Sequence, residues 1–513
     1  MFKNIFKLFV LLIPVFSFGQ TTDQASAQYR PEFHFSPAAG WMSDPNGLVY
    51  LDGEYHLFYQ HRFKGAAPGM YWGHSVSKNL INWTTLPVAL APDSLGYIYS
   101  GSCVVDLKNT SKLGSTANPP LLAFFTYHNL KLAYKESQAM AYSLDKGRTW
   151  KKYSQNPVIK NPGLKDFRDP KVFWNASTKD WRMVVSMGDH VAFYGSKNAV
   201  NWDLLGEFGK GIGDHIGPWE CPDLFPVQVQ GSSEIKWVLL ISVVNLGSDA
   251  DRLATATQYF IGDFDGNTFT TSQKDVRWID FGKDNYAGVT YSNVPGGRKI
   301  FQAWMQSHQY GGLVEQKITK EWAGAATFPR EVKILKMDRE YRLAFEPVKE
   351  LLTIYGPLKS LKNLSIKDSL NLTEKLNIKP FPIELKLRLE NRNLPEKFGI
   401  LLRNKYKEEV RITYDRTIGQ LSVDRTKSTA IKFHDRFSAE QKAKYHPNGK
   451  NIEWTLLLDK ASLELFAADG TLVFTETFYP TRAYDQLAIF SEGGILDIQQ
   501  INIRPLEVKS LMK

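Results

Sequence analysis

The sequence predicts an all-β protein in which a five-bladed β-propeller is followed by a C-terminal β-sandwich. Three observations lead to this prediction. Helix signals are scarce, a polar turn motif recurs at intervals of roughly 50 to 70 residues, and the last third of the chain alternates apolar and polar residues with a period of two. The 513 residues are too many for one ordinary core, and 43% of them are hydrophobic, which allows full burial.

The recurring motif is a polar turn that closes on an aromatic residue. It reads SKNLINW at 77–83 and SKNAVNW at 196–202, with a looser copy at 143–150 and a fourth variant at 263–269. Short strands in repeated units of this length are typical of propeller blades, and chance similarity among Asn/Gly turns is the alternative. Four copies and a final unit at 300–336 predict five blades.

A change of pattern divides the chain after these repeats. We expect the propeller at 27–346, a linker that begins with a short connecting helix at 347–367, and the sandwich at 368–513. In the last region, runs such as 383–389 and 455–466 alternate as half-buried antiparallel strands do.

The N-terminus has the features of a cleavable export signal. Lys3 and Lys7 precede or flank an apolar run at 8–18, and a small-x-small cleavage site ends at Gly19. The run is too short for a resident transmembrane helix, and no later segment is long and apolar enough. We therefore expect a signal peptide at 1–19 and a secreted or periplasmic protein without stable membrane insertion, a membrane anchor being the less favoured alternative.

The charge of the chain argues against a nucleic-acid-binding protein. The net charge of +10 is modest for this length, and no dense Lys/Arg run is interleaved with aromatics, so no nucleic acid partner is expected.

The cysteine content argues against a disulfide-stabilised fold. Cys103 and Cys221 are the two cysteines, and each lies beside a candidate functional motif. Two cysteines cannot form a disulfide framework, and we favour two free, packed thiols over a single bridge.

Three acidic motifs in the first half of the chain carry the functional signal. They are WMSDPNG at 41–47, FRDP at 167–170 and WECPD at 219–223. Taken singly, Asp44 is a β-turn residue, Asp169 belongs to a surface ion pair, and Glu220 is one of many acids. Taken together, carboxylates from distant points of the chain among aromatic residues predict a cleft that cleaves a sugar acetal, which requires one carboxylate and one carboxylic acid.

The neighbouring residues predict different protonation states for the three acids. Glu220 has apolar chain neighbours such as Trp219, which would keep a carboxylic acid protonated. Asp44, in a turn rich in backbone N–H donors, should stay ionised. Asp169, beside Arg168, should stay ionised as well and could hold sugar hydroxyls.

The motifs resemble those of glycoside hydrolase family 32, the β-fructofuranosidases that include invertases, inulinases and levanases. The resemblance covers nearly the whole mature chain. Besides the three acidic motifs, it rests on YHLFYQ at 55–60, WGH at 72–74, YSGS at 99–102, AWM at 303–305, TFPRE at 327–331, VDRT at 423–426 and the stretch 458–470.

The resemblance implies the same two-domain fold and a role for each acid. Asp44 would be the nucleophile that forms a fructosyl-enzyme ester, and Glu220 would be the acid and then the base. Asp169, assisted by Arg168, would stabilise the transition state. The implied binding residues are Trp41, Ser43, Asn46, Gln60, Trp72, Tyr99, Ser100, Arg168 and Trp304. The resemblance further implies retention of configuration, no metal and no organic cofactor.

Two positions depart from the family pattern. Ser43 stands where the family usually has Asn directly before the nucleophile, so the details of fructose binding and a side reaction that transfers fructose stay open. Ala67 lies near the place where the family usually has a Trp, so one wall of the pocket is missing or comes from elsewhere. Neither change removes a group that the mechanism needs.

These observations leave several functions to compare. The leading hypothesis is an exo-acting hydrolase that releases fructose from levan or inulin, and an invertase that prefers sucrose is the runner-up. A fructan-binding protein without turnover is disfavoured because all three acids are present. A sialidase-like propeller would need an arginine triad and a tyrosine nucleophile, which the sequence does not identify, and arabinan-cleaving propellers lack these flanking motifs. Linkage preference, exo or endo action and oligomeric state stay open.

Overall fold

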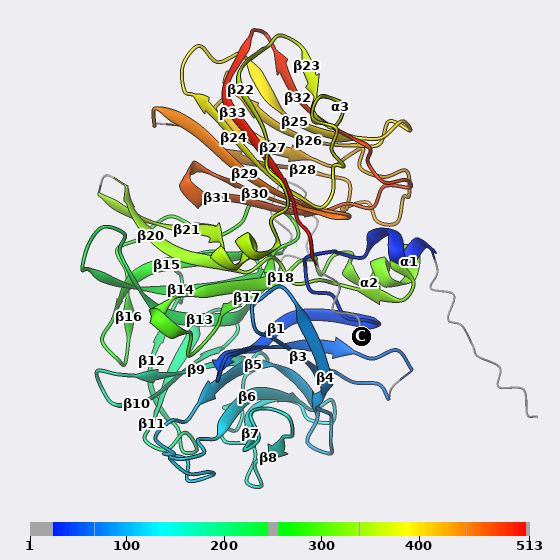
Figure 1. Cartoon of the computed structure of the whole chain (residues 1–513). Coiled ribbons are helices and arrows are strands. Elements are labelled where there is room, and N and C mark those ends of the chain that lie inside the picture. The colour runs from blue at the N-terminus through cyan, green and yellow to red at the C-terminus, as the bar shows by residue number, and fades with distance from the viewer. Residues whose placement is uncertain (1–23, 66, 245–254, 338, 448, 509–513) are drawn as a thin grey trace, which may run out of the picture.

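The computed structural model describes residues 24–65, 67–244, 255–337, 339–447 and 449–508, so the signal peptide expected at 1–19 lies outside the described residues. The described chain is almost entirely β-strand, which confirms the all-β prediction (Figure 1). Its helices are single turns or little more: α1 (Gln24–Tyr29), α2 (Gly311–Val314), α3 (Leu372–Leu376), η1 (Pro295–Gly297), η2 (Glu315–Thr319), η3 (Lys349–Ile354) and η4 (Ala468–Gly470). Within the described ranges, no helix is long and apolar enough to span a membrane.

Five antiparallel sheets follow one another in the N-terminal part of the chain, each a meander of four consecutive strands or nearly so. The first contains β1 (Gly40–Leu51), β2 (Glu54–Arg62), β3 (Tyr71–Ser77) and β4 (Trp83–Leu90), with β19 (Trp322–Ala323) added parallel to β1. The second contains β5 (Tyr97–Val105), β6 (Leu121–His128), β7 (Glu136–Ser143) and β8 (Lys151–Lys152). The third contains β9 (Arg168–Asn175), β10 (Asp180–Ser186), β11 (Val191–Ser196) and β12 (Asp203–Phe208). The fourth contains β13 (Trp219–Gln228), β14 (Ile235–Val244), β15 (Thr255–Phe264) and β16 (Phe269–Thr270), and the fifth β17 (Tyr286–Thr290), β18 (Ile300–Trp304), β20 (Arg330–Met337) and β21 (Glu340–Pro347).

The turn motif found in the sequence joins the third strand of a sheet to the fourth in each of the first four sheets. In the first copy, Asn79 Oδ1 accepts hydrogen bonds from the backbone N–H groups of Ile81 and Asn82, at 3.2 and 2.9 Å. In the second clear copy, at 196–202, Asn198 Oδ1 accepts the equivalent pair at 3.0 and 2.9 Å. A side-chain acceptor that bonds N–H groups two and three residues ahead closes the turn locally, which is why the motif recurs.

The first strands of the five sheets lie next to one another. β1 contacts β5, β5 contacts β9, β9 contacts β13, β13 contacts β17, and β17 contacts β1. Each of these strands is interrupted by a register shift or bulge: between Met42 and Pro45, Ile98 and Gly101, Arg168 and Lys171, Glu220 and Asp223, and Tyr286 and Val289. Bulges turn side chains away from the regular alternation, and they are common beside active sites.

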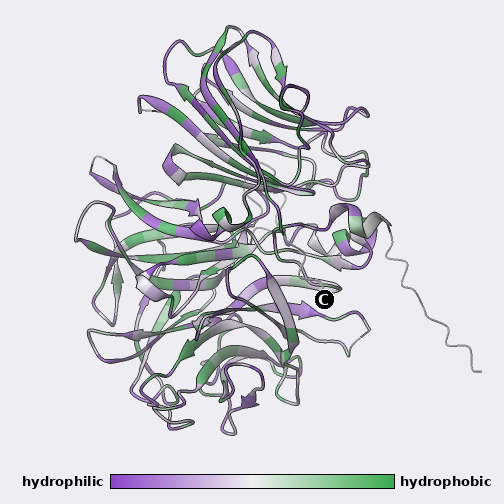
Figure 2. Ribbon diagram, in the orientation of Figure 1, coloured by the Kyte–Doolittle hydropathy of each residue, from purple (hydrophilic) through white to green (hydrophobic). Residues whose placement is uncertain are grey.

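The C-terminal part consists of two six-stranded antiparallel sheets. One contains β22 (Lys359–Ile366), β33 (Leu496–Pro505), β24 (Ile383–Glu390), β29 (Asn451–Asp459), β30 (Ser462–Ala467) and β31 (Leu472–Thr477). The other contains β23 (Ser369–Asn371), β32 (Gln486–Glu492), β25 (Lys397–Arg403), β26 (Glu409–Asp415), β27 (Gln420–Asp424) and β28 (Glu440–Lys444). Apolar side chains of both sheets form one buried cluster, and green and purple alternate along these strands in Figure 2.

The segment 347–367, expected to be a linker, contains more structure than its polar composition indicates. The expected short helix is present as η3, but 359–366 is strand β22, which pairs with β33 along its whole length. Because β22 is an edge strand with most of its side chains exposed, it needs few apolar residues.

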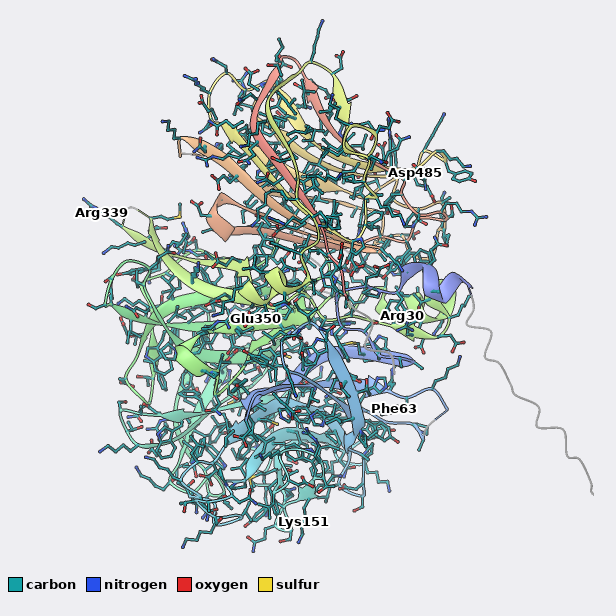
Figure 3. All side chains as sticks on the ribbon, viewed as in Figure 1. Arg30, Phe63, Lys151, Arg339, Glu350 and Asp485 are labelled. Atoms are coloured by element: carbon teal, nitrogen blue, oxygen red, sulfur yellow. The ribbon has the colours of Figure 1, made fainter. Side chains whose placement is uncertain are left out.

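The N-terminal and C-terminal parts share buried charges, and side chains fill the space between their ribbons (Figure 3). Arg330 of β20 pairs with Asp280 at 3.0 Å and with Glu464 of β30 at 2.5 Å. His34 lies between Glu464 and Asp459, at 2.8 and 2.9 Å, and all of these side chains are buried. Buried charges are tolerated only when they are paired in this way, so the interface fixes how the two parts meet.

Candidate active site

Asp44 lies at the bulge of β1, and not in the β-turn that Asp-Pro-Asn-Gly predicts. Pro45 and Asn46 pair with β2, so the motif is part of a strand. Gly47 has φ = 56°, and a Cβ at this position would lie 2.6 Å from the ring of Phe58, so the bulge requires glycine. Asp44 Oδ2 accepts a hydrogen bond from Ser100 Oγ at 2.7 Å, whereas Oδ1 is buried without a partner among the described residues.

Asp169 lies at the start of β9 with φ = 66°, a left-handed conformation that is rare for a residue with a side chain. Its backbone N–H donates to Thr126 Oγ1 at 2.9 Å, and its Oδ2 accepts from the backbone N–H of Cys221 at 2.9 Å. The neighbouring Arg168 is buried, so the surface ion pair that the isolated motif indicates is wrong. A strained backbone held by such bonds is typical of functional sites.

Glu220 lies at the bulge of β13, where both oxygens of its carboxyl group have donors. Arg168 Nη2 and Nε donate to Oε1 at 2.9 and 3.3 Å, and Tyr286 OH donates to Oε2 at 2.5 Å. The apolar chain neighbours therefore do not surround this carboxyl group as expected. Residues adjacent in a strand point to opposite faces, and the fully buried Trp219 packs into the core.

Cys221 connects the aspartates. Its Sγ lies 3.7 Å from Asp44 Oδ2 and 3.7 Å from Asp169 Oδ2, so one sulfur atom touches both carboxyl groups. Cys221 and Cys103 are both free and buried, which confirms the prediction of two packed thiols. Burial raises the pKa of the Cys221 thiol well above its usual range, and the nearby carboxylates add to the rise, so the thiol keeps its proton.

Burial among like charges also changes the protonation of the aspartates. Burial raises the pKa of Asp169 to about 8; the charge of Arg168 lowers it, and the charges of Glu220 and Asp44 raise it. Burial likewise raises the pKa of Asp44, against the opposing effect of His308. The expectation that Asp169 stays ionised is therefore wrong for the free site, because desolvation and three close carboxyl groups outweigh one guanidinium.

Several expected binding residues have buried polar atoms without a partner. Among the described residues, five of the expected site residues have a buried atom without a hydrogen-bond partner: Trp41 Nε1, Asp44 Oδ1, Asn46 Nδ2, Gln60 Oε1 and Trp304 Nε1. Buried polar groups are nearly always satisfied in native structures, so an accumulation of such atoms needs a cause. A polar ligand that supplies the missing donors and acceptors is such a cause.

Contacts place these residues against strands β1 and β5 and against one another. Asn46 Oδ1 accepts from the backbone N–H of Gly101, next to Ser100, at 3.3 Å. The rings of Trp41 and Trp304 meet edge to face at 5.5 Å. Gln60 Nε2 donates to the carbonyl of Ile98 at 3.1 Å.

The remaining expected binding residues, Ser43, Trp72 and Tyr99, differ in what their side chains contact. Trp72 is fully buried in an apolar cluster, and its Nε1 donates to the carbonyl of Tyr99 at 3.0 Å. It therefore holds the backbone of Tyr99 in place and is itself part of the core. Tyr99 stacks on His128 at 4.3 Å. Ser43 is buried beside Asp44 in β1.

Sequence reasoning missed several residues of the site. Tyr286 bonds Glu220, and Glu136 and Asp166 both pair with Arg168 Nη1, at 3.2 and 2.6 Å. The sole signal in the sequence is the position of Asp166, two residues before Arg168. Among the described residues, no cluster of His, Cys, Asp or Glu has an arrangement that could hold a metal ion.

Comparison with known proteins gives the family. Residues 34–347 match the Glycosyl hydrolases family 32 N-terminal domain, and residues 350–505 match the Glycosyl hydrolases family 32 C terminal domain. The chain belongs to glycosyl hydrolase family 32. The recognition of this family from its motifs is confirmed, and the protein is a glycoside hydrolase.

Relatives within family 32 resemble the chain over almost its whole length. The chain is 39% identical to a levanase of Bacillus subtilis over 98% of its own length and 75% of that protein. It is 32% identical to the extracellular exo-inulinase inuE of Aspergillus niger, over 93% of its own length and 94% of that protein. The crystal structure of an exo-inulinase from Aspergillus awamori superposes with a TM-score of 0.84 at 30% identity, covering 93% of this chain and 98% of that one.

Proposed function

We propose that the protein is an exported, retaining fructan hydrolase that releases terminal β-D-fructose from levan or inulin through a fructosyl-enzyme intermediate. The observation that carries the proposal is the meeting of Asp44, Asp169 and Glu220, joined by Cys221 and Arg168 at the bulges of β1, β9 and β13. The names of the levanase and exo-inulinase relatives support fructans as the substrate class.

In the proposed first step, Asp44 attacks the anomeric carbon of the terminal fructose while Glu220 protonates the leaving oxygen. The bond between Asp44 and the sugar forms as the glycosidic bond breaks. Ser100 holds Asp44 Oδ2, which leaves the unpartnered Oδ1 as the attacking atom. In the second step, Glu220 takes a proton from water, and the water oxygen attacks the same carbon. The ester bond to Asp44 breaks, which releases fructose and restores the Asp44 carboxylate.

In this proposal, Asp169 accepts hydrogen bonds from the ring hydroxyls of the fructose. Because its pKa is raised to about 8, the Asp169 carboxyl group holds a proton near neutral pH. Sugar hydroxyls that donate to Asp169 would favour its ionised form, so binding of the sugar and ionisation of the acid support each other. The unpartnered atoms of Asn46, Gln60 and Trp304 are suited to the remaining hydroxyls.

The loop before β3 favours a polymer end over a tight pocket for sucrose. Ala67 and its neighbours Pro68 and Gly69 are small and largely exposed, and the backbone carbonyl of Ala67 accepts a hydrogen bond from Tyr71 at 3.2 Å. Ala67 itself brings only a methyl group to the place where the family usually has a Trp. We therefore expect kcat/KM on fructan oligosaccharides to exceed that on sucrose.

We extend the proposal to the architecture and the location. The five N-terminal sheets would be the blades of a five-bladed propeller, which the closed sequence of contacts among β1, β5, β9, β13 and β17 supports. The domain limits at 27–346, 347–367 and 368–513 and the signal peptide at 1–19 remain predictions. Export is consistent with the extracellular exo-inulinase among the relatives and with a polymeric substrate.

A product analysis on levan, inulin and sucrose tests the proposal, with Asp44→Asn as the inactive control. Fructose as the main product from either polymer, at a higher kcat/KM than from sucrose, is the expected result. A ladder of oligosaccharides would replace exo with endo action, and turnover of sucrose alone would replace the fructan hydrolase with an invertase. Tight binding of fructan without turnover would leave a binding protein.

A further inference from the structure

A cavity of about 750 Å³ lies away from the carboxyl groups, toward the other end of the same first strands. Its lining includes residues 104–108, 171–177, 223–226 and 290–294. In β5, β9, β13 and β17, these positions follow the active-site residues Ser100, Asp169, Glu220 and Tyr286 in the chain. A strand rises about 3.3 Å per residue, so the cavity and the catalytic acids lie roughly 10 Å apart along the strands.

The walls of this cavity are aromatic. They include the side chains of Trp174, Trp181, Phe225, Trp237, Phe264 and Tyr291. Leu107 and Ile235 also line it, and each is 59% exposed. Single exposed aliphatic residues are common on proteins, but two at the edge of an aromatic cavity make its entrance apolar as well.

Most charges at the cavity are paired within the protein. Lys171 Nζ donates to the carbonyl of Thr290 at 2.7 Å and pairs with Asp223 at 3.2 Å. Asp223 Oδ2 accepts from both the N–H and the hydroxyl of Thr290, at 2.5 and 2.7 Å. Asp106 accepts hydrogen bonds from its own loop, and Arg298 pairs with two glutamates.

Lys299 is the exception. Its side chain lines the cavity and is half-buried, and within the described chain its Nζ forms no hydrogen bond or ion pair. Burial lowers the pKa of Lys299, and the nearby Lys171 lowers it further while Asp223 opposes this. Lys108, a second lysine of the lining, lies 4.5 Å from the ring of Trp174. Asp223 acts on Lys299 through its charge alone, because its oxygens bond Lys171 and Thr290. A directly bonded negative partner would stabilise the ammonium group further, and the described residues do not supply one.

We propose that this cavity binds a small organic anion with an aromatic or aliphatic body, whose acidic group pairs with Lys299 while its body packs against the aromatic walls. A neutral sugar would leave Lys299 unpaired, and an inorganic anion would leave the apolar walls without a partner. The site is independent of hydrolysis, because none of its lining residues belongs to the catalytic constellation.

Fluorescence titration of the full chain with anilinonaphthalene sulfonate tests the proposal, because this probe is an aromatic anion that brightens in apolar surroundings. We expect one saturable site, weakened by added salt and displaced by decanoate. Lys299→Met should weaken binding about tenfold or more, since a charge-assisted contact is lost, and Lys299→Arg should restore it. Lys333→Met is the matched control, because Lys333 is a half-buried lysine of the fifth sheet outside the lining of the cavity.

A second variant guards against a folding defect at position 299. Lys108 is exposed, so Lys108→Glu should leave the fold intact and weaken binding by placing a negative charge at the entrance. Equal affinity in the wild type, Lys299→Met and Lys108→Glu would overturn the proposal, as would the absence of saturable binding. Displacement of the probe by fructose would place it in the catalytic pocket and overturn the proposal as well.

Discussion

Replacing Asp169 with Asn should make the protein more stable while it removes activity. The wild-type carboxyl group is fully enclosed near Asp44 and Glu220, and burial with these charges raises its pKa to about 8. An Asn amide is neutral at every pH and can still accept the hydrogen bond that the backbone of Cys221 donates to Asp169 Oδ2. The variant therefore keeps the local geometry and loses the charge.

The magnitude and the sign follow from proton linkage. The pKa of Asp169 rises from its ordinary value of 3.8 to about 8, so the folded state binds more protons than the unfolded state between these pH values. Stability of the wild type therefore falls as pH rises through this window. At about 1.4 kcal/mol per pKa unit, the upper limit is roughly 6 kcal/mol. Because the nearby Asp44 also has a raised pKa, we expect a gain below this limit, about 2–4 kcal/mol for Asp169→Asn above pH 8 and almost none near pH 4.

Unfolding of the wild type and the variant by urea and by heat, at pH 4, 6 and 8.5, measures this difference in stability. Ionisable groups that both proteins contain contribute equally to both stabilities, so their effect cancels in the difference. Asp263→Asn is the control, because Asp263 is exposed, pairs with Lys236 on the surface, and should change stability by less than about 1 kcal/mol at each pH. In parallel, kcat of Asp169→Asn should fall about 10²-fold or more, with a smaller change in KM. A stability difference that does not grow with pH would refute the claim that Asp169 is held at an electrostatic cost.

Three further variants test other parts of the molecule. Glu220→Gln should slow both steps, and aryl fructosides with good leaving groups should recover the first step alone; equal losses on good and poor leaving groups would contradict the role of acid. Tyr286→Phe removes the donor to Glu220 Oε2 and should lower kcat about 10- to 100-fold with little change in KM, whereas a change in KM alone would make Tyr286 a binding residue. His34 has a pKa raised to about 9, because its bonds to Asp459 and Glu464 outweigh the effect of burial. Its stabilisation is therefore complete below about pH 6.5 and is lost as pH rises through about 9, so His34→Gln should cost about 3 kcal/mol at pH 6 and much less above pH 9. A cost that is the same at both pH values would contradict this charge state.

The sequence predicted the parts of this structure that depend on local chemistry. The Asn79 and Asn198 turns were recognisable because a side-chain acceptor bonds its own backbone two and three residues ahead. The sandwich strands were recognisable because one face of each packs on the core. The three acidic motifs were recognisable because each places a carboxyl group next to turn-forming or aromatic residues within a stretch of four to seven residues.

The rest could not be read from neighbouring residues. Asp-Pro-Asn-Gly has the composition of a turn, yet pairing with β2 makes it a bulged strand. Glu220 takes its partners from β9 and β17, so its apolar chain neighbours say nothing about its carboxyl group. Tyr286 has no motif around it, and only the contact of β13 with β17 brings it to Glu220.

The three acids of the site repel one another when they are ionised, so the site needs bonds elsewhere that keep its strands together. Lys171 lies two residues beyond Asp169 in β9, and it bonds Thr290 of β17 and Asp223 of β13. These are the strands that carry Asp169, Tyr286 and Glu220 a few residues earlier. Separation of the strands would relieve the repulsion between the acids, but it would also break this buried ion pair and its hydrogen bonds, which costs more than breaking an exposed pair. The acids remain close because the strands are bonded to one another beside the site, and because that bonding uses charges of opposite sign that the reaction does not need.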